Sequence, residues 1–256
     1  FNRRIFENDR FIAVYAGDFV DQDEFDWSEV CEALSSGTKD FSVLRRLRGM
    51  FALAIYDRSN HVLHAVTDPF SWLPVYCQKT DGGVLVSTSL ASFLRHPTNR
   101  SSASRTWVHQ FLFFNYGIGA TTPLNDVSRL PPATVVSVDL RSQQSIETHY
   151  RPALTRPPEQ LAGRQAIART QAVFDDVVPR YFSDPGKAVI GLSSGLDSRT
   201  LLASLPEQAL DRLHSFTYGI PDTTEVTECQ QIARTLKLQQ TTVPLDEAFQ
   251  NDLPSL

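Results

Sequence analysis

The stretch that decides the fold is residues 189–198, VIGLSSGLDS. An apolar run over residues 187–191 ends in small and hydroxylated residues, and residues 199–205 follow with a helical pattern. A strand that passes through a Ser/Gly loop into a helix presents unpaired backbone N–H groups, which bind anions. Asp197 adds a carboxylate, and a carboxylate beside phosphates is typical of a site that holds Mg²⁺. The stretch therefore predicts a phosphate-binding loop at the carboxyl end of a parallel strand.

Three other interpretations fit parts of this loop. A Walker A loop needs a Lys after its second Gly, and the sequence has none there. Residues 191–195 also match G-x-S-x-G, the nucleophile elbow of α/β-hydrolases, with Ser193 as nucleophile and His214 as the one histidine downstream. His214 lies on the next predicted strand, which leaves little room for a triad. A purely structural interpretation makes Ser193 or Ser194 a helix N-cap and Asp197 a first-turn carboxylate.

The segments around the loop predict a parallel α/β domain. Strands are predicted for residues 187–191, 213–219 and 240–244, and helices for residues 160–181, 199–205 and 225–238. Alternating strands and helices indicate a parallel sheet with right-handed crossovers. We expect a doubly wound sheet that this sequence contains only in part. The first helix is expected to be amphipathic, with its apolar side chains on or near one face: Leu161, Ile167, Val173, Phe174 and Val177.

The first 150 residues instead show short β-like runs separated by turns. Residues 11–16, FIAVYA, predict a buried strand that ends in a turn at Gly17-Asp18. The short spacings between the next runs predict a meandering, largely antiparallel sheet. Residues 26–47 predict helical pieces broken at residues 35–37, and the aromatic-rich residues 107–116 are interpreted as core packing. The further strands are predicted for residues 49–56, 62–67, 84–88 and 134–140.

The chain is thus predicted to hold a β-rich domain over residues 1–150, a proline-rich linker over residues 151–160 and an α/β domain over residues 161–256. With 41% hydrophobic residues and a net charge of −5, the composition argues against a disordered chain and against a nucleic-acid-binding protein. No apolar run approaches the ~18 residues of a membrane span. Three widely spaced cysteines indicate no structural metal site and predict a cytoplasmic protein.

Residues 193–198, SSGLDS, resemble the SGGxDS pyrophosphate loop of the N-type ATP pyrophosphatases, in particular the synthetase domain of the asparagine synthetases. Ser194 replaces the first Gly of that motif. Three motifs of the N-terminal half are similar to the same family. Residues 47–57 resemble LRGMFAFAxxD, residues 67–76 resemble RDxxGxxPLY without its Arg and its Gly, and residues 130–133 resemble LPPG. The matches follow the family's order over nearly the whole chain.

The resemblance implies a class II glutamine amidotransferase domain of the Ntn-hydrolase-like fold, followed by an ATP-dependent amidating domain. In that family ATP adenylates a substrate carboxylate, and ammonia from glutamine then displaces AMP. The implied small-molecule partners are ATP with Mg²⁺, an amino-acid carboxylate and glutamine, and a homodimer is left open. Ser193 and Asp197 are the implied catalytic residues, with Asp197 acting through Mg²⁺. The implied nucleotide-binding residues are Leu192, Ser193, Ser194, Gly195, Leu196, Asp197, Ser198 and Tyr218.

The glutaminase half departs from the family pattern. The chain begins with Phe1 and lacks the N-terminal Cys nucleophile, so we expect the family's first residues, and its last synthetase residues, to lie outside this sequence. Residues 14–20 resemble the family's strand ending in NGEIY. Ala16 then replaces the Asn of the oxyanion hole, while Gly17 and Asp18 remain as glutamine-binding candidates. The acidic residue of the family's SDTE element falls on either Asp26 or Glu29. We therefore expect a degenerate glutaminase domain.

Three functions are compatible with this pattern. The first is an asparagine-synthetase-like ligase that forms an amide through a carboxyl-adenylate and releases AMP and pyrophosphate. The second is an ATP-dependent cyclase of the β-lactam synthetase or lasso-peptide cyclase type, in which the glutaminase domain is inactive. The third is a non-catalytic homologue that only binds nucleotide.

Overall fold

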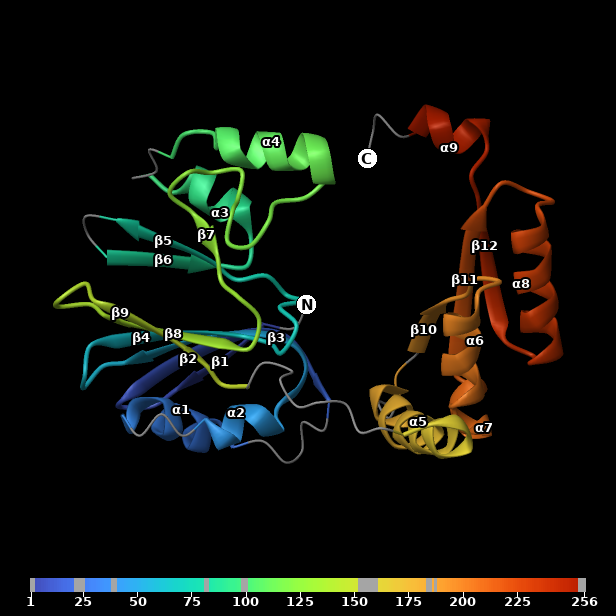
Figure 1. The fold of residues 1–256 in the computed structure, drawn as a ribbon, viewed down its shortest axis with the longest axis horizontal. Helices are drawn as coiled ribbons and strands as arrows, with labels where there is room; N and C mark the ends of the chain where they lie inside the picture. The colour runs from blue at the N-terminus through green and yellow to red at the C-terminus, as the bar shows by residue number, and fades with distance from the viewer. Residues whose placement is uncertain are drawn as a thin grey trace. The chain divides into compact units, whose positions relative to one another are not determined.

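The computed structural model describes residues 3–20, 26–37, 41–80, 83–97, 101–151, 161–182, 186 and 188–252. The chain divides into two compact units, Phe1–Arg156 and Pro157–Leu256, which are treated separately below (Figure 1). Apart from Arg151, the expected linker lies outside the described residues.

The first unit is built on a six-stranded sheet in which every neighbouring pair is antiparallel. In sheet order, its strands are β1 (Arg3–Glu7), β2 (Phe11–Val20), β3 (Arg48–Asp57), β4 (Val62–Thr67), β8 (Thr134–Asp139) and β9 (Ser145–His149). Buried residues alternate with more exposed ones at the start of β2, as expected for a sheet whose two faces differ.

Each face of this sheet buries a different set of side chains. Helices α1 (Trp27–Ser35) and α2 (Ser42–Arg46) cover one face, where Val30 and Leu44 pack with Phe51 and Leu53. On the other face Ala52, Ala65 and Val136 join Val75 in a second cluster. A second antiparallel sheet, in the order β6 (Gly83–Ser87), β5 (Tyr76–Thr80) and β7 (Ser128–Arg129), lies on that side (Figure 1). These layers confirm the antiparallel β-rich fold expected for this half.

Two strand predictions need correction. The run over residues 84–88 forms β6, which belongs to the second sheet and not to a single meander with β3 and β4. Strand β2 does not end at residue 16 but continues to Val20. Gly17 adopts φ +109°, a conformation open to glycine, so the backbone passes through this point without turning away.

The interpretation of residues 107–116 as core packing is wrong. Residues Arg105–Phe114 form helix α4, which begins after the N-cap Ser104 and has no buried residue. Its phenylalanine side chains are exposed, up to 83% for Phe113, and Trp107 is half-buried. Figure 1 shows α4 beside the shorter helix α3 (Leu90–Arg95), at the edge of the unit beyond the second sheet.

The second unit contains the predicted parallel sheet, in the order β10 (Ala188–Gly191), β11 (Leu213–Gly219) and β12 (Gln239–Pro244). The strands lie in sequence order, which is one winding half of a doubly wound sheet. Its core joins Ile190 and Leu213 of the strands to Leu202 and Cys229 of the helices. The remaining elements are α5 (Gly163–Val177), a 3₁₀ helix (Val178–Phe182), α6 (Leu196–Ala203), α7 (Glu207–Leu210), α8 (Thr224–Thr235) and α9 (Glu247–Asp252).

Two helices of this unit differ from their predictions. Helix α6 begins at Leu196 instead of residue 199, so Asp197 and Ser198 lie in its first turn. In α5, Phe174 packs against the core as expected, but Ile167 is 68% exposed and Val173 45% exposed. The predicted apolar face of α5 is therefore only partly covered by described residues. In the described part of the chain, no helix is both long enough and apolar enough to cross a lipid bilayer.

Candidate functional site

The predicted phosphate loop lies between β10 and α6, at the carboxyl end of the parallel strands. The Leu192 N–H donates to the Phe216 carbonyl at 2.8 Å, which extends the pairing with β11 by one residue past Gly191. Gly195 is the N-cap of α6 and has no side chain with which to cap the helix. The structural interpretation, in which Ser193 or Ser194 is the N-cap, is therefore wrong. The N–H groups of the first turn of α6 are left without a cap from this position.

Ser198 shapes the loop from within. Its Oγ donates to the Ser193 carbonyl at 3.0 Å and accepts from the Ser193 N–H at 3.2 Å. The Ser193 Oγ lies 3.2 Å from the Ser198 Oγ and accepts from the Gly195 N–H at 3.3 Å. Ser198 is only 7% exposed. These contacts make Ser198 a brace of the loop, whereas Ser194 and Gly195 lie nearer the surface.

Asp197 is exposed in the first turn of α6. Within the described part of the chain its carboxylate forms no hydrogen bond or ion pair, so it is available for a ligand. An uncapped helix start attracts anions, and a free carboxylate attracts a cation. No cluster of three or more His, Cys, Asp or Glu side chains among the described residues could hold a metal ion alone. The residues present thus fit Mg²⁺ bound through one carboxylate and phosphate oxygens, as Mg²⁺ is usually bound.

Of the other residues expected to bind the nucleotide, some are exposed and one is buried. Tyr218 is 66% exposed near the carboxyl end of β11, and Leu196 is 73% exposed at the start of α6. Leu192 is only 3% exposed and packs in the core, so its backbone is the part that a ligand would meet. The structure therefore brings Asp197 and Tyr218 to the same edge of the sheet, because parallel strands end together there.

The hydrolase interpretation is not supported by the position of His214. Its Nε2 lies 2.8 Å from the Thr241 Oγ1 on β12, and its register partner on β10 is Val189. His214 therefore lies beside Val189, and Val189 precedes Ser193 by four residues, which is roughly 13 Å along an extended strand. The His214 ring is thus far from the Ser193 hydroxyl. The Ser193 hydroxyl instead contacts Ser198. Ser193 and His214 do not form a nucleophile–base pair.

Sequence reasoning missed two buried side chains that reach the strand end before the loop. The Thr217 Oγ1 donates to the Leu192 carbonyl at 2.9 Å, and the Cys229 Sγ lies 3.5 Å from the same oxygen. Burial raises the pKa of the Cys229 thiol, which keeps it a neutral donor. In the structure buried residues alternate along β11 and Thr217 lies on the buried face, but the apolar pattern of LHSFTYG does not mark this position, because Phe216 and Tyr218 lie on the exposed face.

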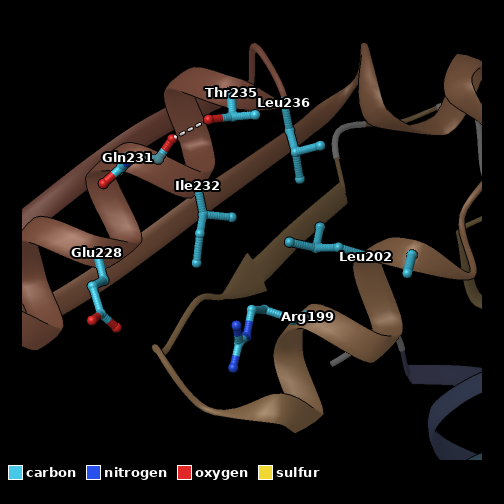
Figure 2. A pocket seen from close by; sticks show the side chains of 8 residues that line it. Arg199, Leu202, Glu228, Gln231, Ile232, Thr235 and Leu236 are labelled. Atoms are coloured by element: carbon cyan, nitrogen blue, oxygen red, sulfur yellow. Dashed lines mark hydrogen bonds between the residues drawn. The ribbon is translucent and has the colours of Figure 1, made fainter.

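A cleft of about 490 Å³ lies between α6 and α8. Figure 2 shows Leu202, Ile232 and Leu236 along it, with Arg199 and Glu228 on opposite helices. No residue from 193 to 198 lines it, so this cleft is not the phosphate loop. A wider groove of about 640 Å³ between α5 and α6 shares Arg199 with it and includes Leu196. The Arg199 Nε donates to the Gly195 carbonyl at 3.1 Å, which ties the cleft wall to the end of the loop.

In the first unit, the glutamine-binding candidates lie on β2. Asp18 is exposed and Gly17 is buried. A Cβ on Gly17 would lie 2.0 Å from the Met50 carbonyl oxygen, so only glycine fits. Ala16 lines a cleft of about 270 Å³ between the two sheets, together with Val86, Ser87, Thr88 and Ser92. The side chain of Ala16 at this cleft is a methyl group, which cannot donate a hydrogen bond.

The two acidic candidates after β2 have structural partners. The Asp26 carboxylate accepts from the Ser28 N–H at 2.8 Å and caps α1. Glu29 forms an ion pair with Arg46. Both contacts favour structural roles, and residues 21–25, which carry further acidic side chains, lie outside the described residues.

Comparisons with known proteins assign both halves of the chain. Residues 29–151 match the glutamine amidotransferase domain family, and residues 170–256 match the asparagine synthase family. The chain is 23% identical over 214 residues to asparagine synthetase [glutamine-hydrolyzing] 1 of Bacillus subtilis, covering 82% of this chain and 33% of the relative. It is 22% identical over 162 residues to asparagine synthetase [glutamine-hydrolyzing] 3 of the same organism, covering 61% of this chain and 25% of the relative. The chain thus spans a quarter to a third of the length of these curated relatives.

Among solved structures, the chain is similar to glutamine phosphoribosylpyrophosphate amidotransferase from B. subtilis, with a TM-score of 0.35 and 10% identity over 98% of this chain and 52% of that chain. A structure described as the allosteric regulatory enzyme of purine biosynthesis gives a TM-score of 0.34 and 11% identity over 93% of this chain and 62% of that chain. The order of the two matched domains and the names of the sequence relatives agree with the motifs at both ends of the chain. The two matched domain families and the names of these relatives support the asparagine synthetase family for this chain.

Proposed function

We propose that this chain is part of an ATP-dependent ligase that forms an amide through a carboxyl-adenylate and releases AMP and pyrophosphate. The observation that carries the proposal is the loop between β10 and α6, in which an uncapped helix start and the free carboxylate of Asp197 lie together. A triphosphate is the ligand class that requires both an anion site and a bound cation. The two B. subtilis relatives are named as glutamine-hydrolysing asparagine synthetases, which supports the same class.

Each part of the loop has a distinct task in this proposal. The backbone N–H groups at the start of α6 bind the pyrophosphate, because the helix N-terminus favours negative charge. The Ser194 side chain adds a donor at the surface of the loop, and the Ser198 contacts hold the Ser193 backbone in place. Tyr218 borders the nucleotide at the end of β11. This arrangement stabilises negative charge as it collects on the leaving pyrophosphate.

Asp197 is the residue that would hold Mg²⁺. The cation, when bound, neutralises phosphate charge in the transition state, which is worth several kcal/mol. The role of the chain is to keep the Asp197 carboxylate free and at the mouth of the loop, where no described side chain competes for it.

The experiment is ATP–pyrophosphate exchange in the full-length protein, with a panel of amino-acid carboxylates. We expect exchange with at least one carboxylate, and production of ADP and phosphate would contradict the proposal. Asp197→Ala should abolish exchange while shifting the melting temperature little, because a first-turn carboxylate contributes only about 0.3–1 kcal/mol. Glu207→Ala is the matched control, since Glu207 is the first-turn carboxylate of α7. Near-normal exchange by Asp197→Ala would refute the assignment of the loop.

The cleft at Ala16 favours a second candidate for the nitrogen donor. Loss of one oxyanion-hole donor typically costs about 10²–10³ in rate, and the Ala16 methyl cannot donate. We therefore propose that the amidotransferase unit hydrolyses glutamine poorly, so that the amine comes from ammonia or from the substrate itself, as in a cyclase. Comparing amide formation with glutamine, with ammonium and with neither separates these donors. Efficient use of glutamine would refute this second proposal.

A further inference from the structure

The peptide that joins Leu192 to Ser193 is held at both edges. On one edge, the Leu192 carbonyl accepts from the Thr217 Oγ1 at 2.9 Å and contacts the Cys229 Sγ at 3.5 Å. On the other edge, the Ser193 N–H donates to the Ser198 Oγ at 3.2 Å. The partners come from β11, α8 and α6, and Thr217 and Cys229 are 3% and 0% exposed.

Hydrogen bonds to both the carbonyl and the N–H of the Leu192–Ser193 peptide fix the direction in which the backbone leaves β10. A trans peptide is planar, and its carbonyl and N–H point to opposite sides. Rotation of this plane would break the contacts on both edges at once. Since the next residues are Ser193, Ser194 and Gly195, the orientation of this one peptide sets where the loop's N–H groups point.

The hydroxyl of Thr217 is itself oriented by a neighbouring strand. The Gln240 Nε2 on β12 donates to the Thr217 Oγ1 at 3.3 Å. An amide donor at this oxygen leaves the hydroxyl proton directed to the Leu192 carbonyl. The three parallel strands are thereby linked through side chains, from Gln240 to Thr217 to the end of β10.

We propose that Thr217, oriented by Gln240, is a positioning residue for the pyrophosphate loop, and that Cys229 supports it at the same carbonyl. Thr217 acts through the Leu192–Ser193 peptide and does not touch the nucleotide. This inference rests on the proposed function for its effect on catalysis, but its effect on the loop backbone is independent of any activity.

Ser215 provides a matched control on the same strand. It precedes Thr217 by two residues, so both side chains leave the same face of β11. Its Oγ donates to the Gln239 carbonyl at 3.2 Å, and the residue is fully buried. Thr217→Val and Ser215→Ala each remove one buried hydroxyl-to-carbonyl bond from β11, but only Thr217 reaches the loop. Thr217→Ser keeps the hydroxyl and loses only a methyl group.

The experiment combines two measurements on the full-length protein. Hydrogen exchange follows the backbone amides of residues 193–195, and ATP–pyrophosphate exchange gives kcat and KM for MgATP. Loss of a hydrogen bond worth about 1.4 kcal/mol predicts roughly tenfold faster amide exchange in Thr217→Val. We expect a rise of similar size in KM for MgATP, with both effects absent in Ser215→Ala and largely reversed in Thr217→Ser. Gln240→Leu should show a smaller change in the same direction.

Several results would overturn the inference. One is an equal response of Thr217→Val and Ser215→Ala in both measurements, which would mean that only the stability of the sheet matters. Another is a Thr217→Ser variant as impaired as Thr217→Val. If the wild-type protein shows no ATP–pyrophosphate exchange, the proposed function fails, and hydrogen exchange alone still decides whether Thr217 positions the loop.

Discussion

Five described non-glycine residues of the first unit have a positive φ, and two of them, Ser71 and Ala133, fall in the family motifs. Ser71 adopts φ +52° and Ala133 adopts φ +50°. They occupy the Gly positions of the motifs RDxxGxxPLY and LPPG. The left-handed conformation costs a non-glycine residue about 1–2 kcal/mol. Buried Asp68 organises the first of these turns, because its carboxylate accepts from the N–H groups of Phe70, Trp72 and Leu73 at 2.9–3.1 Å.

Ser71→Gly should therefore stabilise the first unit. The Ser71 Oγ is buried and has no hydrogen-bond partner among the described residues, so the substitution removes both backbone strain and an unsatisfied hydroxyl. Glycine has a greater conformational entropy in the unfolded chain, which offsets about 0.5–1 kcal/mol of this stabilisation. The free energy of unfolding should therefore rise by about 1 kcal/mol. Thermal unfolding measures this gain. Ala133→Gly is the control: it relieves similar strain but loses a buried methyl group worth about 0.8 kcal/mol, so its net effect should be near zero. A destabilised Ser71→Gly would contradict the argument.

His64 is a buried histidine inside the six-stranded sheet. Its Nδ1 lies 2.8 Å from the Ser137 Oγ, and its Nε2 has no partner among the described residues. Burial lowers its pKa from the ordinary value to about 4, although the negative charge of Asp57 acts in the opposite direction. The folded state therefore keeps His64 neutral at a pH where the unfolded chain would already bind a proton.

This difference predicts the sign of a pH effect on stability. Between about pH 6.5 and 4 the unfolded state binds more protons, so the free energy of unfolding should fall as the pH falls. The slope from His64 is at most about 1.4 kcal/mol per pH unit. Urea unfolding at pH 7 and pH 5 should show a smaller loss in His64→Gln than in the wild type, whereas His109→Gln, at an exposed position, should match the wild type. Equal losses in all three proteins would rule out His64 as the source.

Asp57 titrates in a different window. Burial would raise the pKa of its carboxyl, but the hydrogen bonds from Arg10 and Asn60 lower it below the ordinary value. Its contribution to stability is lost only below about pH 4, so it does not disturb the measurement on His64.

At the scale of elements, the pairing of β2 with β3 depends on two glycines. A Cβ on Gly17 would lie 2.0 Å from the Met50 oxygen, and a Cβ on Gly49 would lie 2.2 Å from the Asp18 oxygen. Backbone strain and overpacking each cost about 1–3 kcal/mol, so Gly17→Ala should destabilise the unit by about 3 kcal/mol or more. Gly37→Ala is the control, because Gly37 also has a positive φ of +70° but no atom within 4 Å of the added Cβ. Chemical denaturation compares the two, and similar losses would mean that conformation alone matters.

The strands that the sequence could predict are those with apolar runs. Apolar runs such as residues 62–67 and 213–219 coincide with β4 and β11, because buried strands require continuous or alternating apolar residues. Strands β5 (YCQKT) and β9 (SIETH) were missed because few of their side chains are buried and their residues form no apolar run. The continuation of β2 past Gly17 depends on close contact with β3, which no local pattern records.

For the candidate site, the sequence predicted the position of the loop but not the contacts within and behind it. Small residues between a strand and a helix located the loop, since this composition follows from local backbone requirements. The role of Ser198 inside the loop and the contact of Thr217 with Leu192 depend on which atoms meet after folding. The exposure of α4 was predicted wrongly, because aromatic content does not reveal which surface a helix faces.

At the scale of the whole molecule, the two units have separate cores. Leu53 lies in the core of the first unit, between the six-stranded sheet and α1, and Leu213 lies in the core of the parallel unit. Both residues are 1% exposed. Each described core cluster takes its buried members from one unit, so each unit has the apolar contacts that support cooperative unfolding of its own.

We therefore expect the chain to unfold in two calorimetric transitions that respond to different substitutions. Leu53→Ala and Leu213→Ala remove the same atoms from equally buried positions and should each cost about 2–5 kcal/mol. Leu53→Ala should lower only the transition of the antiparallel unit, and Leu213→Ala only that of the parallel unit. MgATP should raise the second transition alone if it binds at Asp197, since a ligand stabilises the unit that binds it. A single transition lowered by both substitutions would contradict this expectation, because it would show that the two units unfold together.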